Sequence, residues 1–305
     1  MLDASNPYYV QMVLLMDLLR VSTSEACFAL KGGTAINLFY RDLPRLSVDI
    51  DLTYLPLEPR KDTLKGIETA LERMADVIAK RIKGIRVVAG GRVEGANTKL
   101  MVSRGLSKVK MEVSTILRGS VKEPELRSVT ESVENVFGSA EARVLSFQDI
   151  YAGKICAALD RQHPRDFFDV KLLLENEGIA DGLMDVFLVY LLGGDRPIAE
   201  MLAPNPIPLA DVFRSQFQGM ALIPTTVEDL NRTRHTLIAV IQEKLTGEQR
   251  RFLLTFKSGD PDWDRLGLPG IEKLPSIQWK LQNIRRMDPG KREQALESLR
   301  RVLKI

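Results

Sequence analysis

Apolar residues recur at helical spacing near the start of the chain and then give way to short strand-like runs. PYYVQMVLLMDLLRV (7–21) predicts an N-terminal helix, because its apolar residues repeat with the helical period. ACFAL (26–30) predicts a short buried strand. A glycine pair breaks that strand, and TAINLFY (34–40) predicts a helix that its first residue can cap. SVDIDLTYL (47–55) then predicts another strand.

Strand-like and helical patterns separate along the rest of the chain. A long amphipathic helix is predicted from about residue 61 to 83, and three strand-like runs follow it: IRVVAGGRV (85–93), TKLMVSR (98–104) and SKVKMEVS (107–114). From LSFQDIYAGKICAALDR onward strands become scarce, and two helices broken near His163 are predicted first. The pattern therefore predicts an α+β fold, with a mixed sheet in residues 1–135 and a helical domain in 136–305.

Composition places the chain among folded globular proteins. Of 305 residues, 45% are hydrophobic and 27% are charged. No apolar run approaches the ~20 residues of a membrane span. The start, MLDASNPYYV, lacks the basic and apolar regions of a signal peptide, so we expect a cytoplasmic protein without a membrane partner. Two cysteines without CxxC spacing and two histidines exclude a disulfide framework and make a zinc site improbable.

The net charge of +3 is unevenly distributed. From Arg250 to Ile305 thirteen Lys and Arg residues face seven Asp and Glu residues, which gives this tail +6 and leaves about −3 for the rest. Such a basic tail is compatible with a polyanionic partner such as RNA. A solvated helix surface explains the same surplus equally well.

Two aspartates lie one residue apart in the strand at 47–55. Because side chains alternate across a strand, Asp49 and Asp51 point to one face while Val48, Ile50 and Leu52 point to the core. Adjacent carboxylates repel each other, and Mg²⁺, which prefers oxygen ligands, is the usual remedy. The alternative interpretation is a solvated edge strand with two harmless charges.

The neighbouring residues favour the metal interpretation. Gly32, Gly33 and Thr34 lie between a strand and a helix, where backbone amides can approach phosphate oxygens, although glycine pairs also form ordinary turns. Glu112 shares one strand face with Lys110 and Ser114, a pattern that on its own indicates solvent exposure. Together, the glycines and the three acids fit two-metal phosphoryl or nucleotidyl transfer.

These residues resemble the first motif of AbiEii/AbiGii-type nucleotidyltransferase toxins, which belong to type IV toxin–antitoxin and abortive-infection systems. The resemblance begins at KGGTAINLFYRDLPRLSVDIDLTY (31–54) and continues in VKMEVS, SFQDIYAGKICAALDR (146–161) and HPRDFFDV (163–170). It spans roughly the first 175 residues and implies a polymerase-β-like nucleotidyltransferase core followed by a helical C-terminal domain.

The resemblance also implies roles for individual residues. The nucleotide-phosphate loop would be Gly32, Gly33 and Thr34, with Arg45 and Ser47 as the polar residues that precede the DxD motif. Asp49 and Asp51 would be catalytic metal ligands, and Glu112 falls where a third acid often lies in the wider superfamily. From the helical domain, the family's functional lysine matches Lys154 and the aspartate of its last motif matches Asp166, both directed to the cleft.

The spacing of the helix at 146–161 has two interpretations. Lys154 and Arg161 lie on one side of it and can both reach toward a triphosphate. Alternatively, Lys154 forms a surface ion pair with Asp149 or Asp160. Asp166 either orients Lys154 or accepts a proton from the incoming hydroxyl. On these grounds we expect Lys154→Ala to fold normally and to lose toxicity.

The implied function is Mg²⁺-dependent transfer of a nucleotide from an NTP donor to an RNA acceptor, with the tRNA 3′ end as the acceptor type, in a toxin that has a cognate antitoxin. Two other functions stay open. DIDLT also fits the DxDxT signature of haloacid-dehalogenase-type phosphatases. The same core could also be a catalytically silent module that binds nucleotides or a protein partner.

Overall fold

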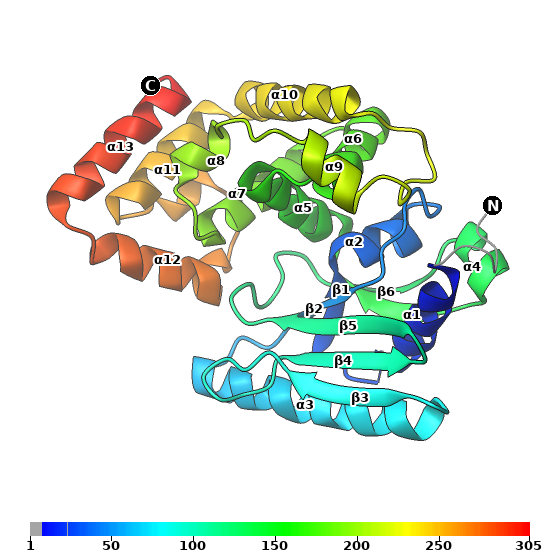
Figure 1. Cartoon of the computed structure of the whole chain (residues 1–305). Helices are drawn as coiled ribbons and strands as arrows, with labels where there is room; N and C mark the ends of the chain where they lie inside the picture. The colour runs from blue at the N-terminus through cyan, green and yellow to red at the C-terminus, as the bar shows by residue number, and fades with distance from the viewer. Residues whose placement is uncertain (1–7, 23) are drawn as a thin grey trace. The chain divides into compact units, whose positions relative to one another are not determined.

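The chain forms two compact units. A computed structural model describes residues 8–22 and 24–305. The first unit runs to Ile150 and regains residues 220–223, and the second holds residues 151–219 and 224–305. Figure 1 draws the first unit from blue to green and most of the second from green to red.

A seven-stranded mixed sheet is the centre of the first unit. Its order is β3-β4-β5-β2-β1-β7-β6. The β1–β2, β3–β4, β4–β5 and β6–β7 pairs are antiparallel, and the β2–β5 and β1–β7 pairs are parallel. The strands are β1 (Phe28–Lys31), β2 (Ile50–Tyr54), β3 (Arg86–Gly90), β4 (Lys99–Arg104), β5 (Ser107–Ser114), β6 (Glu125–Ser128) and β7 (Glu141–Val144).

Helices pack against this sheet and around its edges. They are α1 (Tyr9–Ser22), α2 (Gly32–Ala35), the π-helix η1 (Ile36–Tyr40), α3 (Arg60–Arg81) and α4 (Glu131–Phe137). The apolar side of α3 packs against β3 and β4, and α1 packs against β5 and α3. Along β4 and β5 every second residue is buried, namely Leu100, Val102, Val109, Met111 and Val113. This alternation buries one sheet face in the core and leaves the other face for function.

The second unit is helical throughout its described residues. Helix α5 (Phe147–Arg161) enters it from the first unit. It is followed by α6 (Pro164–Asn176), α7 (Asp181–Gly193), α8 (Ile198–Leu202), α9 (Ala210–Gln216), α10 (Val227–Lys244), α11 (Gly247–Ser258), the 3₁₀ turns η2 (Trp263–Arg265) and η3 (Ile271–Lys273), α12 (Pro275–Arg285) and α13 (Pro289–Leu303). Helix α7 is apolar on nearly every side and packs against α8, α10 and α12, so it forms the centre of this unit.

Local sequence signals explain several of these boundaries. Thr226 and Asp229 form a reciprocal capping box at the start of α10, and Thr246 and Gln249 form another at α11. His163 caps α6, because its Nδ1 accepts a hydrogen bond from the Arg165 amide. The predicted helix break at His163 is therefore confirmed.

The predicted α+β fold with a mixed sheet followed by helices is confirmed. The N-terminal helix appears from Tyr9 onward, and residue 7 of its predicted range lies outside the described residues. The division falls after Ile150, whereas the sequence places it after residue 135, because β7 pairs with β1 and keeps residues 141–144 in the sheet. Within the described part of the chain, no helix combines the length and apolarity needed to cross a bilayer.

Candidate functional site

The two aspartates of the DxD motif lie at the start of β2. The strand begins at Ile50, so Asp49 is the last residue before it and Asp51 the second within it. Ile50 and Leu52 are buried, whereas Asp49 and Asp51 are partly exposed, and the Asp49 side chain retains 42% of its accessible surface. The alternation predicted from the sequence is thus present, and both carboxylates belong to the face opposite the core.

A glycine turn lies against these aspartates, where β1 passes directly into α2. Gly32 has φ +76°, and a Cβ placed on it would lie 2.9 Å from Asp51 Oδ2. Both the left-handed backbone and the nearby carboxylate therefore require glycine here. Because α2 starts at Gly32, the prediction that Thr34 caps the helix is wrong. Thr34 is buried one turn inside, where its hydroxyl donates to the Asp49 carbonyl and also bonds Ser47 Oγ at 3.1 Å.

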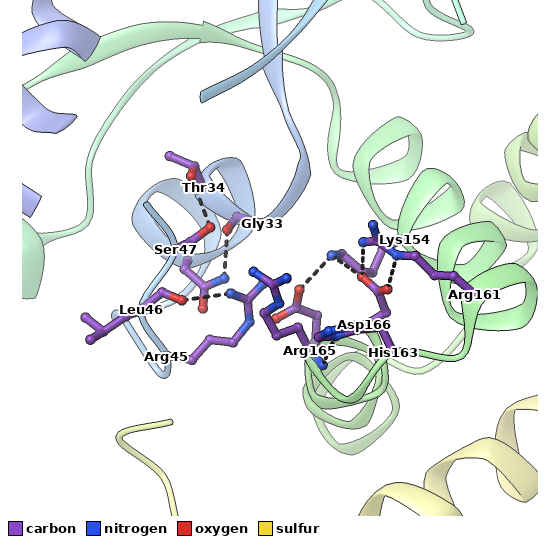
Figure 2. Close-up of polar contacts among 12 residues, drawn as sticks. Gly33, Thr34, Arg45, Leu46, Ser47, Lys154, Arg161, His163, Arg165 and Asp166 are labelled. Atoms are coloured by element: carbon purple, nitrogen blue, oxygen red, sulfur yellow. Dashed lines mark hydrogen bonds and ion pairs between the residues drawn. The ribbon is translucent and has the colours of Figure 1, made fainter. Parts of the chain in front are cut away.

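Arg45 and Ser47, which precede the DxD motif, pack against the glycine turn. Arg45 is only 2% exposed, and its Nη1 donates to the Leu46 carbonyl at 2.9 Å. A Cβ on Gly33 would lie 2.6 Å from Arg45 Nη2 and 2.9 Å from Ser47 Oγ, so the guanidinium and the hydroxyl pack directly on that glycine. Figure 2 shows Gly33, Thr34, Arg45 and Ser47 grouped in this way. Arg45 therefore stabilises the turn from a buried position.

Residues 220–223, which are distant in the sequence, fix the backbone around Arg45. Arg45 forms an isolated antiparallel bridge with Ala221. On either side, the Leu46 amide donates to the Met220 carbonyl at 2.9 Å and the Leu222 amide to the Pro44 carbonyl at 2.8 Å. No sequence motif indicates this contact, because its two segments are far apart in the chain.

Lysines surround the acids of the sheet face. Glu112 pairs with Asp51 in register and bonds Lys110 at 2.8 Å and Lys99 at 3.1 Å. Burial alone would raise the pKa of Glu112, but hydrogen bonds from Lys110 and Lys99 outweigh it and lower the pKa. Lys110 Nζ also lies 3.9 Å from Asp49 Oδ2. Glu112 thus shares its carboxylate with two ammonium groups.

The donor chemistry of Asp49 and Asp51 fits a magnesium ion. Both offer partly exposed carboxylate oxygens on one sheet face, and the carboxylate of Asp51 fills the space beside Gly32. Among the described residues, no group of three His, Cys, Asp or Glu side chains is arranged to hold a metal. Mg²⁺ commonly binds through one or two carboxylates, with substrate phosphates and water completing its shell. Two aspartates are therefore enough protein ligands for such an ion, whereas a metal-binding role of Glu112 stays a prediction.

A second polar cluster lies in the helical unit, between α5 and α6. Lys154 Nζ is 2.8 Å from Asp166 Oδ1 and 2.9 Å from Asp169 Oδ2. Lys154 is 7% exposed and both carboxylates are fully buried. Arg161 donates two hydrogen bonds to Asp166, from Nε to Oδ2 at 2.6 Å and from Nη2 to Oδ1 at 2.9 Å. Figure 2 shows that Lys154 and Arg161 both contact this carboxylate.

The partners of Lys154 differ from the surface pairs considered from the sequence. Asp160 pairs with Arg196, and Asp149 accepts hydrogen bonds from Ser146 and from the backbone amides of residues 121 and 122. Burial by itself raises the pKa of Asp166, but the charges and hydrogen bonds of Lys154 and Arg161 hold the pKa well below its usual range. Asp166 is therefore ionised at neutral pH.

Asp169 is a cluster member that the candidate site from sequence omits. It follows Asp166 by three residues, a spacing that places both side chains on one helix face. By itself, the four-residue spacing of Arg165 and Asp169 predicts only a salt bridge on the helix surface. The repeated aspartate in RDFFD was the signal that could have identified it.

Comparison with known proteins decides the family. Residues 13–283 match the family described as nucleotidyl transferase AbiEii toxin of the type IV toxin–antitoxin system. The chain belongs to the AbiEii family. AbiEii proteins are nucleotidyltransferase toxins, so this membership replaces the phosphatase interpretation of DIDLT and implies a nucleotide substrate and an antitoxin.

One solved toxin structure agrees with the fold of this AbiEii protein. MenT4, a nucleotidyltransferase toxin from Mycobacterium tuberculosis H37Rv, superimposes with a TM-score of 0.59 at 14% identity, covering 97% of this chain and 95% of MenT4. JHP933 from Helicobacter pylori gives a TM-score of 0.48 at 18% identity, over 79% of this chain and 94% of that one. No protein with curated annotation matches the sequence.

Proposed function

We propose that this AbiEii protein transfers a nucleoside monophosphate from an NTP to a hydroxyl of an RNA acceptor, the 3′ end of tRNA, in a Mg²⁺-dependent reaction. The observation that carries the proposal is the pair of partly exposed carboxylates, Asp49 and Asp51, beside a glycine turn on the uncovered sheet face. Asp49 and Asp51 would hold the metal, which when bound supplies positive charge that neutralises the triphosphate.

The glycine turn is the proposed contact for the donor phosphates. The first amides of a helix have no partner inside the helix and favour anions. Gly32 and Gly33 present these amides without side chains, while Arg45 and Ser47 pack beneath them and keep the turn in place. Thr34 supports the same turn through its bond to the Asp49 carbonyl and so links the turn to the first aspartate.

Within the helical unit considered by itself, Arg161 is the cation that we assign to an anionic substrate. Its side chain is 61% exposed, whereas Lys154 is buried. Because the pKa of Asp166 is lowered, this carboxylate is a poor proton acceptor at neutral pH. We therefore assign Asp166 and Lys154 to positioning Arg161, and not to proton transfer.

A labelling assay tests the reaction. The protein is incubated with each α-³²P-labelled NTP, Mg²⁺ and total RNA, and label is expected in an RNA band. Asp49→Asn should abolish the band, and Asp76→Asn, an exposed aspartate of α3, should retain it. Nucleotide binding without any labelled RNA would instead identify a silent module, and release of phosphate from small esters would restore the phosphatase interpretation.

A kinetic assay tests the role of Arg161. Loss of a charge-assisted contact of about 1.5–3 kcal/mol corresponds to a rise of roughly 10- to 100-fold in KM for the NTP in Arg161→Gln. Arg214→Gln, at an exposed arginine of α9, is the matched control. An unchanged KM in the folded Arg161 variant would show that Arg161 does not bind the anionic substrate.

A further inference from the structure

The outer half of the sheet has one uncovered face that continues into the candidate site. Strands β4 and β5 bury alternate residues on the side of α1 and α3, and β3 pairs with β4 in register, so the intervening residues of the three strands share the opposite face. Six of them define what we name the open face: Arg86, Val88, Lys99, Met101, Lys108 and Lys110. Val88 is 46% and Met101 38% exposed, and the two pair in register, so they form a small apolar patch on this face.

Strand register connects this face with the aspartates. Val88 pairs with Met101 and Met101 with Lys110, so the three lie in one row across the sheet. Lys110 Nζ ends that row 3.9 Å from Asp49 Oδ2. The neighbouring row passes from Lys99 through Glu112 to Asp51. Both rows therefore run from the sheet edge to the DxD motif within the first unit.

The open face carries a net positive charge, although Glu112 pairs with Lys99 and Lys110. Among the outward residues of β3, β4 and β5, four cations stand against one acid, Glu112. Arg86 and Lys108 are exposed at the end of the face away from Gly90. A positive surface attracts phosphates through counterion release, and a methionine thioether packs favourably on aromatic rings. An apolar strip between cations thus suits nucleotides, with a base or ribose on Met101 and phosphates on the flanking side chains.

We propose that the open face binds the single-stranded end of the RNA acceptor, with the chain crossing Met101 and Lys110 toward Asp49. The inference rests on the proposed transfer to RNA and adds the surface that holds the acceptor. An acidic protein partner would be attracted by the same cations. Continuity with the DxD motif favours RNA, because the reacting end of the acceptor has to reach the metal-binding aspartates.

Fluorescence anisotropy tests the proposal without any chemistry. The full chain is titrated into a fluorescein-labelled single-stranded RNA oligonucleotide in EDTA, without NTP, over a range of salt concentrations. In Arg86→Glu/Lys108→Glu the affinity should fall at least about tenfold at low salt, and the slope of log K against log salt should decrease by about 1.4, since each phosphate contact on a single strand contributes ~0.7. Met101→Ser should weaken binding about threefold or more with an unchanged salt slope, since it removes the thioether that packs on a base.

The matched control is Lys61→Glu/Lys65→Glu, at exposed positions of α3 on the covered side of the sheet, where affinity should stay within about twofold. Circular dichroism confirms that each variant is folded. Equal RNA affinity in the open-face and control variants would overturn the inference. The same holds if the open-face variants lose only binding of an acidic protein. In that event RNA labelling would continue and the proposed function would stand. Conversely, RNA binding that depends on the open face in a protein that labels no RNA would refute the function alone.

Discussion

Removal of the Lys154 ammonium is the most informative perturbation of the helical unit. Lys154→Met keeps most of the apolar stem but removes a charge that two fully buried carboxylates share, at 2.8 Å from Asp166 and 2.9 Å from Asp169. Breaking a buried ion pair by removing one partner costs about 3–5 kcal/mol. Because Arg161 still donates two bonds to Asp166, we expect the lower end, ~3 kcal/mol.

The protein carries a convenient reporter for this measurement. Its two tryptophans, Trp263 and Trp279, both lie in the helical unit, so intrinsic fluorescence follows the unfolding of that unit. At about 2–4 °C for each kcal/mol in a domain of 150–250 residues, a loss of ~3 kcal/mol lowers Tm by about 6–12 °C. Lys154→Arg, which keeps the charge, should lose less stability than Lys154→Met.

A double-mutant cycle isolates the ion pair. Asp166→Asn in the Lys154→Met background should cost less than Asp166→Asn alone, with a coupling energy of about 1–3 kcal/mol. The free energy of unfolding of Lys154→Met could instead lie within ~1 kcal/mol of the parent value, or the effects of the two substitutions could be additive. Either result would show that the buried ion pair does not stabilise the protein. This expectation replaces the sequence-based one that Lys154→Ala folds normally. Loss of toxicity in a Lys154 variant therefore has to be read beside its stability.

Acid titration provides an independent test of the same cluster. The pKa of Asp166 is lower in the folded protein than the ~3.9 of an unfolded aspartate. Its contribution to stability is therefore complete above about pH 4 and is lost as the pH falls toward the folded pKa. The parent should lose stability more steeply below about pH 4 than Asp166→Asn, as measured by urea unfolding at each pH. Parallel pH profiles would contradict the lowered pKa.

Two further predictions concern the sheet unit. In Gly33→Ala the new Cβ would lie 2.6 Å from Arg45 Nη2 and 2.9 Å from Ser47 Oγ. This overpacking should lower the free energy of unfolding by about 1–3 kcal/mol, as measured by urea unfolding followed by circular dichroism. An unchanged free energy of unfolding would show that the Arg45 and Ser47 side chains move aside. Lys110→Met removes the ammonium that lies 3.9 Å from Asp49 Oδ2 and competes with a metal for this carboxylate. Because such a pair contributes ~1 kcal/mol in water, Mn²⁺ should bind the variant at least about fivefold more tightly, as measured by calorimetry. Unchanged Mn²⁺ affinity would mean that Lys110 does not compete for Asp49.

Much of the sheet and the DxD geometry follows from the order of residues alone. Alternation of polar and apolar residues predicted the strand of Lys110 and Glu112, and burial of Val109, Met111 and Val113 agrees with it. The same rule placed Asp49 and Asp51 on one face, because a strand has a period of two wherever it occurs. The break at His163 was equally local, since Pro164 supplies the first residue of α6.

Other features depend on partners that are distant in sequence. Strands β6 and β7 lack the continuous apolar run that marked β1, and β7 lies in the sheet because it pairs with β1. Thr34 appeared suited to cap a helix, yet its hydroxyl bonds the Asp49 carbonyl after the chain has folded back. Lys154 appeared to lie on a helix surface until α6 brought Asp166 and Asp169 against it.

The division between these two groups has one physical origin. Hydrophobic period, glycine conformation and helix capping act between residues a few positions apart, so the chain encodes them directly. The nucleotidyltransferase assignment came from the resemblance of the motifs to a known family, which the family match confirms. Burial and charge neutralisation depend on which segments meet in the folded protein. Only tertiary packing could reveal that Arg45 is a buried support, that Glu112 is shared by two lysines, and that Arg161 is the exposed cation of its cluster.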